Sequence, residues 1–307
     1  KNYPYTCMEQ KVSRAVALQD SDLWKKVVAE LPAHLDRDGL VKYFPRMPFG
    51  YDYLTAYLLA VTHEAGWKLP DDIRKRMEDG LRGFIEGRVI RYSSLPTADL
   101  SIRKMAALEA LSRSGKADAK LLSAINVEAD LWPTSAVLDW LNVLHRMGTI
   151  PDREARRSQA EQIIRSRLNF QGTAMLFSTE QADYLWWLMQ GGDVNAVRII
   201  LTFLSDEKWK DDMPRLVRGA LGRMHRGAWG TTTANAWGVI SMKKFSDKFE
   251  SQPVTGATTV NLDRDQKTIS AEQRATNGFV DFHWPAGKKP LTIRHEGAGK
   301  PWVTLQS

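Results

Sequence analysis

Apolar residues recur with the period of an α-helix over most of this chain, from about residue 7 to residue 247. The spacing i, i+3, i+4, i+7 is found in five segments, whose first apolar residues are Trp24, Leu54, Val137, Ala196 and Val217. This pattern predicts roughly ten to twelve helices, each with one apolar stripe, and no strand. Such helices can close as a bundle, a solenoid or an α/α toroid, and the period alone does not choose among them.

Glycines punctuate the helical pattern where C-terminal caps are expected. They stand at Gly66, Gly115, Gly148 and Gly191-Gly192. The sequence therefore predicts that short turns join the helices.

The pattern changes after residue 247. Residues 259–262 and 302–305 are β-prone, and apolar side chains alternate with polar ones over residues 280–284 and 291–295. We therefore predict two parts: an α-helical domain at residues 1–247 and a partial β-domain at residues 248–307. A sheet this small, with exposed edges, is expected to pack against something else.

The only cysteine, Cys7, has a glutamine, Gln10, three residues downstream. At the start of a helix this spacing places the two side chains on one face. An internal thioester forms if the Cys7 sulfur replaces the ammonia of the Gln10 carboxamide, and that acyl group then acylates amines or hydroxyls. Cys-x-Glu-Gln is a short motif, and a small buried cysteine in a first helical turn is the alternative reading.

Charge and composition narrow the function classes. The formal net charge is +7, but the arginines between residues 153 and 167 alternate with acidic residues, which favours a solvated helix face over nucleic-acid binding. No apolar run approaches the roughly 20 residues that span a bilayer. The six histidines show no metal-ligand spacing, so we expect no metal site and no cofactor, and we expect these histidines at surface or capping positions. Because the motif begins almost at once after Lys1, we expect a fragment of a longer precursor.

The residues around Cys7 carry a resemblance to a known family. The run from Tyr3 to Gln10 resembles the thioester motif of α2-macroglobulins and complement components, in the form typical of bacterial α2-macroglobulin-like proteins. Three further segments are similar to that family: residues 38–70, 227–237 and 291–302. Because they lie at the beginning, late in the helical part and near the end, the resemblance extends over essentially the whole chain.

The resemblance implies a mainly α fold, an α/α toroid of about six helical hairpins, followed by a small β-rich segment of the complement-like or macroglobulin-like β-domain. It implies a broad-spectrum protease inhibitor of bacterial defence rather than an enzyme, with the Cys7–Gln10 thioester acylating lysines of a trapped protease. It also implies a periplasmic protein, anchored at the inner membrane by a lipid outside this fragment, whose partners are proteases and the other domains of its own polypeptide. Tyr3, Tyr5 and Met8 are candidates for the apolar cover that keeps water from the bond.

One position departs from the family pattern. Vertebrate members usually carry glycine directly before the cysteine, where this chain has Thr6. A β-branched residue is costly at positive φ, so a non-covalent interaction domain with an inactive thioester is the first alternative.

The second alternative is an α/α-toroid enzyme, which needs a constellation of carboxylates. Asp71-Asp72 and Asp211-Asp212 each open an apolar-periodic segment, so we expect them to be helix N-terminal charges instead. Glu9, in the first turn after Cys7, is expected to have the same role.

Overall fold

The computed structural model describes residues 6–95, 97–179, 183–273, 278–303 and 305. The chain divides into two compact units, Lys1–Met242 and Lys243–Ser307. This division lies inside the last helix, α11 (Thr232–Phe249), and the predicted boundary at residue 247 lies in the same helix.

Helices are the main regular elements of the first unit, so the prediction of a mainly α fold is confirmed. Its first half contains α1 (Met8–Leu18), α2 (Ser21–His34), α3 (Asp52–Ala65), α4 (Asp71–Ile85), α5 (Leu100–Ser112) and α6 (Ala119–Ser123). Its second half contains α7 (Thr134–Arg146), α8 (Arg153–Ser166), α9 (Gly192–Phe203), α10 (Met213–Gly222) and the beginning of α11. Short 3₁₀ turns lie at Ala129–Leu131, Trp186–Leu188 and Glu207–Trp209.

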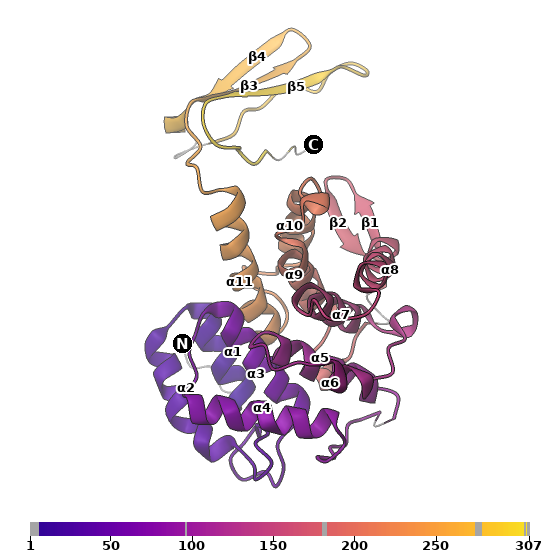
Figure 1. Cartoon of the computed structure of the whole chain (residues 1–307). Helices are drawn as coiled ribbons and strands as arrows, with labels where there is room; N and C mark the ends of the chain where they lie inside the picture. Colours follow the sequence, from indigo (N-terminus) through magenta and orange to yellow (C-terminus); the bar gives the residue numbers. More distant parts are fainter. Residues whose placement is uncertain (1–5, 96, 180–182, 274–277, 304, 306–307) are drawn as a thin grey trace. The chain divides into compact units, whose positions relative to one another are not determined.

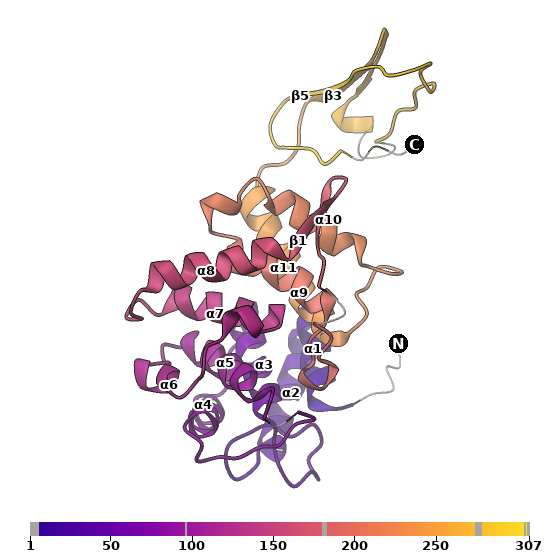
Figure 2. The same cartoon turned by 90° about the vertical axis from the view of Figure 1, so that its right-hand side faces the viewer.

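The odd-numbered helices follow one another around the first unit (Figures 1 and 2). Helix α1 contacts α3, α3 contacts α5, α5 contacts α7, and α7 contacts α9. Outside them, α2 packs on α1, α4 on α3 and α5, α8 on α7, and α10 on α9. Helix α11 meets α9 where Ser241 Oγ donates to the Val197 carbonyl (2.8 Å), and it meets α1 where Thr232 Oγ1 donates to Glu9 Oε1 (2.8 Å). An α/α toroid has this succession of inner and outer helices, with its last helix beside its first.

Burial separates the inner helices from the outer ones. Every residue of α3 from Asp52 to Thr62 and of α7 from Thr134 to Leu144 is buried, whereas α8 buries only Ala160 and Ile164. Helices α3 and α7 each have a neighbouring helix on both sides and an outer helix behind them, so little of their surface is left for solvent.

Charged side chains inside the ring are paired. Glu109 of α5 accepts from Arg113 (2.7 Å) and from Arg146 (2.9 Å), and Arg198 of α9 donates to Asp139 of α7 (2.5 Å). Each of these bonds except Glu109–Arg113 joins two helices, so the buried charges also fix which helices are neighbours.

Two local predictions for the first unit were wrong. Strands β1 (Leu168–Gln171) and β2 (Ala174–Phe177) form an antiparallel hairpin where no strand was expected, with Gly172 at φ 60° in its two-residue loop. Gly191-Gly192 begins α9 instead of ending a helix. The cap at Gly66 is confirmed, since this residue ends α3 in the left-handed conformation.

The second unit contains a three-stranded antiparallel sheet of order β4–β3–β5. Strands β3 (Ala257–Leu262) and β5 (Leu291–Glu296) were predicted, whereas β4 (Asp265–Ile269) was missed because it is mostly polar. The alternating residues 280–284 form no strand, and neither do the described residues between 301 and 305. Instead Val280, Phe282 and Trp302 line a cavity together with Val260 and Ile293 of the sheet. Residues of these segments thus gather beside the sheet without joining it through a ladder of backbone hydrogen bonds, and Trp302 stays 41% exposed.

In the part of the chain that the structure describes, no helix has both the length and the apolar character needed to cross a bilayer.

Candidate functional site

The loop between α2 and α3 holds the start of α1. Asp36 Oδ1 accepts from the amides of Asp38 and Leu40 (both 2.9 Å), and Asp36 Oδ2 accepts from Gly50 (2.7 Å). Gly39 has φ +86°, and a side chain there would lie 2.1 Å from the Arg76 carbonyl oxygen, so this tight turn requires glycine.

The fixed loop reaches the thioester motif through one backbone hydrogen bond, from the Met8 amide to the carbonyl of Tyr43 (2.9 Å). Met8 itself is completely buried, in agreement with a role in the apolar cover. Tyr3 and Tyr5, the other expected members of that cover, lie outside the described residues.

Cys7 is the N-cap residue of α1, with extended backbone (φ −70°, ψ 159°), and its carbonyl accepts the Lys11 amide (3.1 Å). Its side chain is 9% exposed. Burial raises the pKa of the Cys7 thiol, and the nearby backbone amide of Gln10 offsets this only in part. The thiol is therefore held neutral in a largely dry position.

Gln10 lies in the first turn of α1 with a half-buried side chain. The structure thus places Cys7 and Gln10 at the N-cap and the third helical position, where two side chains share one face. Formation of the bond between them stays a prediction.

Glu9 lies in the first turn of α1, as expected for a helix N-terminal charge. Its carboxylate also makes contacts that the sequence did not predict. Oε1 accepts from Ser13 Oγ (2.6 Å) and from Thr232 Oγ1 of α11 (2.8 Å), and Ser13 Oγ is in turn 2.6 Å from the hydroxyl of Tyr57 in α3. The residue is 8% exposed, and burial raises the pKa of its carboxyl group. Glu9 therefore joins three helices at the thioester motif.

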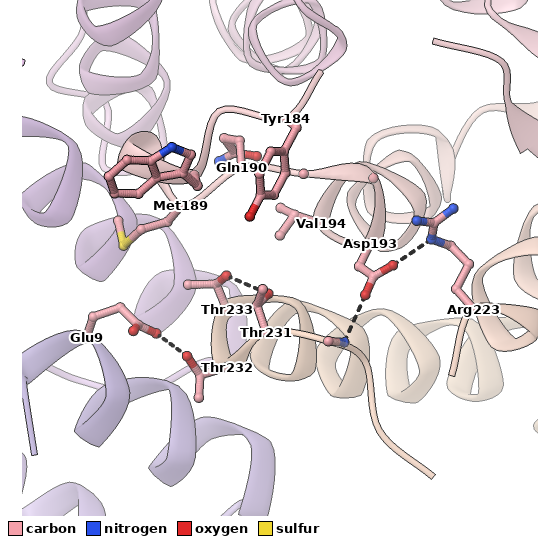
Figure 3. Close-up of a pocket in the computed structure, with 14 residues that line it drawn as sticks. Glu9, Tyr184, Met189, Gln190, Asp193, Val194, Arg223, Thr231, Thr232 and Thr233 are labelled. Carbon is pink, nitrogen blue, oxygen red and sulfur yellow. Dashed lines mark hydrogen bonds and ion pairs between the residues drawn. The ribbon is translucent and has the colours of Figure 1, made fainter. Parts of the chain in front are cut away.

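A cavity of about 780 Å³ adjoins Glu9 (Figure 3). Its walls come from three parts of the chain: the start of α1, the segment that leads into α9, and the loop that leads into α11. The residues that line it are Glu9, Tyr184, Trp186, Met189–Val194, Arg223 and Gly230–Thr233.

One wall of the cavity is tied together by Asp193. Its Oδ1 accepts from Arg223 Nε (2.7 Å), and its Oδ2 accepts from the Gly230 amide (2.8 Å), as Figure 3 shows. On another wall Gln190 is 8% exposed and its Nε2 donates to the Tyr53 hydroxyl. Its Oε1 is buried and has no hydrogen-bond partner among the described residues.

The motif at residues 227–237 shapes the last wall. Trp229 Nε1 donates to the Ala220 carbonyl (2.8 Å), and Asn235 accepts from the Trp229 amide (3.1 Å) while donating to the Trp229 carbonyl (2.8 Å). These bonds hold the loop in place, with Thr231–Thr233 beside Glu9 and Thr232 bonded to it (Figure 3). Trp237 packs inside the ring, with its ring edge toward Tyr57.

The remaining candidates lie elsewhere. Asp71 and Asp72 are in the first turn of α4 and Asp212 is the N-cap of α10, which confirms them as helix N-terminal charges. His34 is buried, with Nδ1 2.9 Å from the Lys42 carbonyl oxygen, so the expectation of a surface position was wrong for this residue. No group of three His, Cys, Asp or Glu side chains suited to a metal ion occurs among the described residues.

Sequence reasoning missed the walls of the cavity. Gly191-Gly192 was read as the end of a helix, although the acidic residue after it, Asp193, followed by an apolar helical period, also marks a helix start. Tyr184, Trp186 and Gln190 carry no periodic signal, because they lie in irregular backbone around a 3₁₀ turn.

No protein-family model and no curated protein sequence matches this chain. Solved structures do match it. In Escherichia coli α2-macroglobulin in its native conformation, the chain aligns over 87% of its length and 17% of that protein, with a TM-score of 0.61 and 19% identity. Trypsin-activated α2-macroglobulin from the same organism matches 95% of this chain over 19% of its own length, with a TM-score of 0.58 and 16% identity. Salmonella α2-macroglobulin reacted with methylamine matches 90% of this chain over 19% of its own length, with a TM-score of 0.58 and 17% identity.

Because these sequence identities are low, the similarity shows a shared fold and nothing more. The chain also spans about a fifth of the length of each of these three relatives. Over most of its length, it has the fold of the matching part of bacterial α2-macroglobulins.

Proposed function

We propose that this chain is the thioester domain of a bacterial α2-macroglobulin-like protease inhibitor, with part of the β-domain that follows. The observation that carries the proposal is the placement of Cys7 and Gln10 on the first turn of a helix, half-buried or better, in a chain with the fold of bacterial α2-macroglobulins. The Cys-x-Glu-Gln motif is short enough to occur by chance, and the shared fold supports its interpretation as a thioester motif.

The chemistry follows from the two side chains. The Cys7 thiol attacks the Gln10 carboxamide carbon, its proton passes to the leaving nitrogen, ammonia leaves, and a thioester remains. A lysine amine of the trapped protease then attacks the same carbon; an amide forms between Gln10 and the protease, and the C–S bond breaks. Cys7 leaves and takes up a proton. Water competes for the carbon, so the low exposure of Cys7 and Met8 would lengthen the lifetime of the bond.

Two properties of the relatives support this reaction. One solved relative was activated by trypsin and another was reacted with methylamine, a protease and a small amine respectively. We extend both properties to this chain and propose that proteases are its covalent targets, which it traps without turning over a substrate. Its non-covalent partners are the other domains of its parent polypeptide. We further propose a periplasmic location, with an inner-membrane lipid anchor outside this chain.

The test uses the full-length protein that contains this chain. Treatment with methylamine should release one titratable thiol and add the full mass of methylamine to the thioester-bearing chain, as an N-methylamide at Gln10. Cys7→Ala and Gln10→Glu should both abolish the reaction, because the first lacks the sulfur and the second lacks an amide to displace. Gln159→Glu, on the exposed side of α8, is the matched control and should react like the wild type.

A Cys7 thiol that titrates freely in fresh, untreated protein would contradict the proposal. That result would favour the alternative of a non-covalent interaction domain. A circular-dichroism spectrum of Cys7→Ala identical to that of the wild type separates loss of chemistry from loss of fold.

A further inference from the structure

The cavity beside Glu9 is rich in hydrogen-bond acceptors. The carboxylate of Glu9 accepts two hydroxyl donors at the same oxygen, Oε1, which leaves Oε2 able to accept from a ligand. The buried Oε1 of Gln190 has no partner among the described residues. A buried acceptor without a partner is costly, and a ligand donor entering the cavity would remove that cost.

The cavity also has aromatic faces. Tyr184 and Trp186 line it and are 63% and 65% exposed. Aromatic faces attract cations, and ammonium groups in particular. Among the described lining residues the one cation, Arg223, is paired with Asp193. The charge and the hydrogen-bonding groups of this cavity therefore suit a cationic donor.

The cavity is close to the reacting bond. Glu9 precedes Gln10 in the chain, and consecutive Cα atoms are about 3.8 Å apart. The wall of the cavity that Glu9 forms therefore belongs to the same first turn of α1 that carries Gln10.

On the basis of the function proposed above, we propose that this cavity binds the ammonium group of the attacking amine and that Glu9 accepts its proton. An alkylammonium ion cannot attack, because its nitrogen has no lone pair. Transfer of one proton from the ammonium to the Glu9 carboxylate frees the lone pair, the C–N bond to Gln10 forms, and the C–S bond breaks. The second proton passes to the leaving Cys7 sulfur, and Glu9 then returns its own proton to water. Hydroxyl groups of Thr232 and Ser13 hold the carboxylate in position for this transfer.

The experiment compares two nucleophiles on the full-length protein. Methylamine is a cation at neutral pH, whereas hydroxylamine is neutral there and needs no proton acceptor before attack. Glu9→Gln keeps the shape and the hydroxyl contacts of the side chain but removes its charge. We expect its rate of thiol release by methylamine to fall at least about tenfold, with the hydroxylamine rate within about twofold of wild type. Glu30→Gln, on α2 and half-exposed, is the matched control and should change neither rate.

Two other variants test the walls without touching α1. Trp186→Ala and Gln190→Leu should raise the methylamine concentration that gives half of the maximal rate, and tetramethylammonium, a cation that cannot react, should inhibit the wild type competitively. These variants keep the proposal falsifiable if Glu9→Gln does not form the thioester, which intact mass shows directly.

The outcomes are distinct. Suppose that Glu9→Gln forms the thioester. If the methylamine and hydroxylamine rates then fall by the same factor, or if neither rate falls, Glu9 has no role in proton transfer and the inference is overturned. If Glu9→Gln forms no bond, unchanged kinetics in both wall variants overturn the inference. If wild-type protein releases no thiol with either nucleophile, the proposed thioester function itself fails.

Discussion

Replacing Gly238 by alanine should destabilise the helical unit, because Trp229 leaves no room for a side chain there. A Cβ atom at Gly238 would lie 2.3 Å from Trp229 Cζ3 and 2.6 Å from Cε3, well inside van der Waals contact. The rigid indole ring cannot bend away, and Trp229 is itself buried and bonded through Nε1 to the Ala220 carbonyl. Gly238→Ala therefore tests whether the loop before α11 is packed against the helix as the structure shows.

The expected cost combines three terms. Overpacking a core costs about 1–3 kcal/mol, and moving the indole away from Ala220 adds about 0.5–1.5 kcal/mol for the lost hydrogen bond. Alanine is a better helix former than glycine by about 1 kcal/mol, which offsets part of this. The net expectation is a loss of about 0.5–3.5 kcal/mol. In a unit of this size each kcal/mol lowers the Tm by about 2–4 °C.

Urea unfolding followed by tryptophan fluorescence and circular dichroism measures the change. Gly222→Ala is the matched control: Gly222 ends helix α10, and a Cβ there would meet nothing within 4 Å. This control should be neutral or stabilising by up to about 1 kcal/mol. The double variant Gly238→Ala/Trp229→Phe should be less destabilised than the sum of its single variants, because the smaller ring relieves the clash.

If Gly238→Ala is as stable as Gly222→Ala, or if the double variant shows no coupling, the packing of Trp229 on α11 is not as described. The argument that the 227–237 motif shapes the cavity would then fail as well.

Two further predictions concern the buried charges. Glu109→Leu should destabilise the protein by about 3–5 kcal/mol in urea unfolding, because Arg113 would lose a buried carboxylate. Asp22→Asn, which removes one partner of an exposed ion pair, should leave stability essentially unchanged, and equal effects of the two variants would contradict the buried network. Burial lowers the pKa of His145 to about 4 from an ordinary value of 6.5. The unfolded chain therefore binds the proton more readily, and stability from this residue, complete above pH 6.5, should be lost as the pH falls toward 4. His145→Gln should weaken that pH dependence between these two values, and an unchanged slope of unfolding free energy against pH would refute the assignment.

The helical period was readable from the sequence because each helix has to bury one stripe, whatever its neighbours are. The periodic segments that start at Trp24, Leu54 and Val137 lie within α2, α3 and α7, so the period located these helices correctly. Hairpin β1–β2 and strand β4 were not readable in the same way. Their side chains are mostly polar or half-exposed, so backbone pairing and the turn at Gly172 hold them more than burial does.

The two reacting positions were also set by sequence, since three residues of spacing at a helix start place Cys7 and Gln10 on one face in any tertiary context. The cavity was not. It brings together Glu9, Gln190 and Thr232, which are far apart in the chain, and it exists only because the last helix returns beside the first. No local sequence pattern predicts that these residues lie together. The helical period shows which face of a helix is buried, but it does not show which other helix covers that face. Sequence therefore determined the pair of residues on which the proposed chemistry rests, and the tertiary structure alone decided what surrounds that pair.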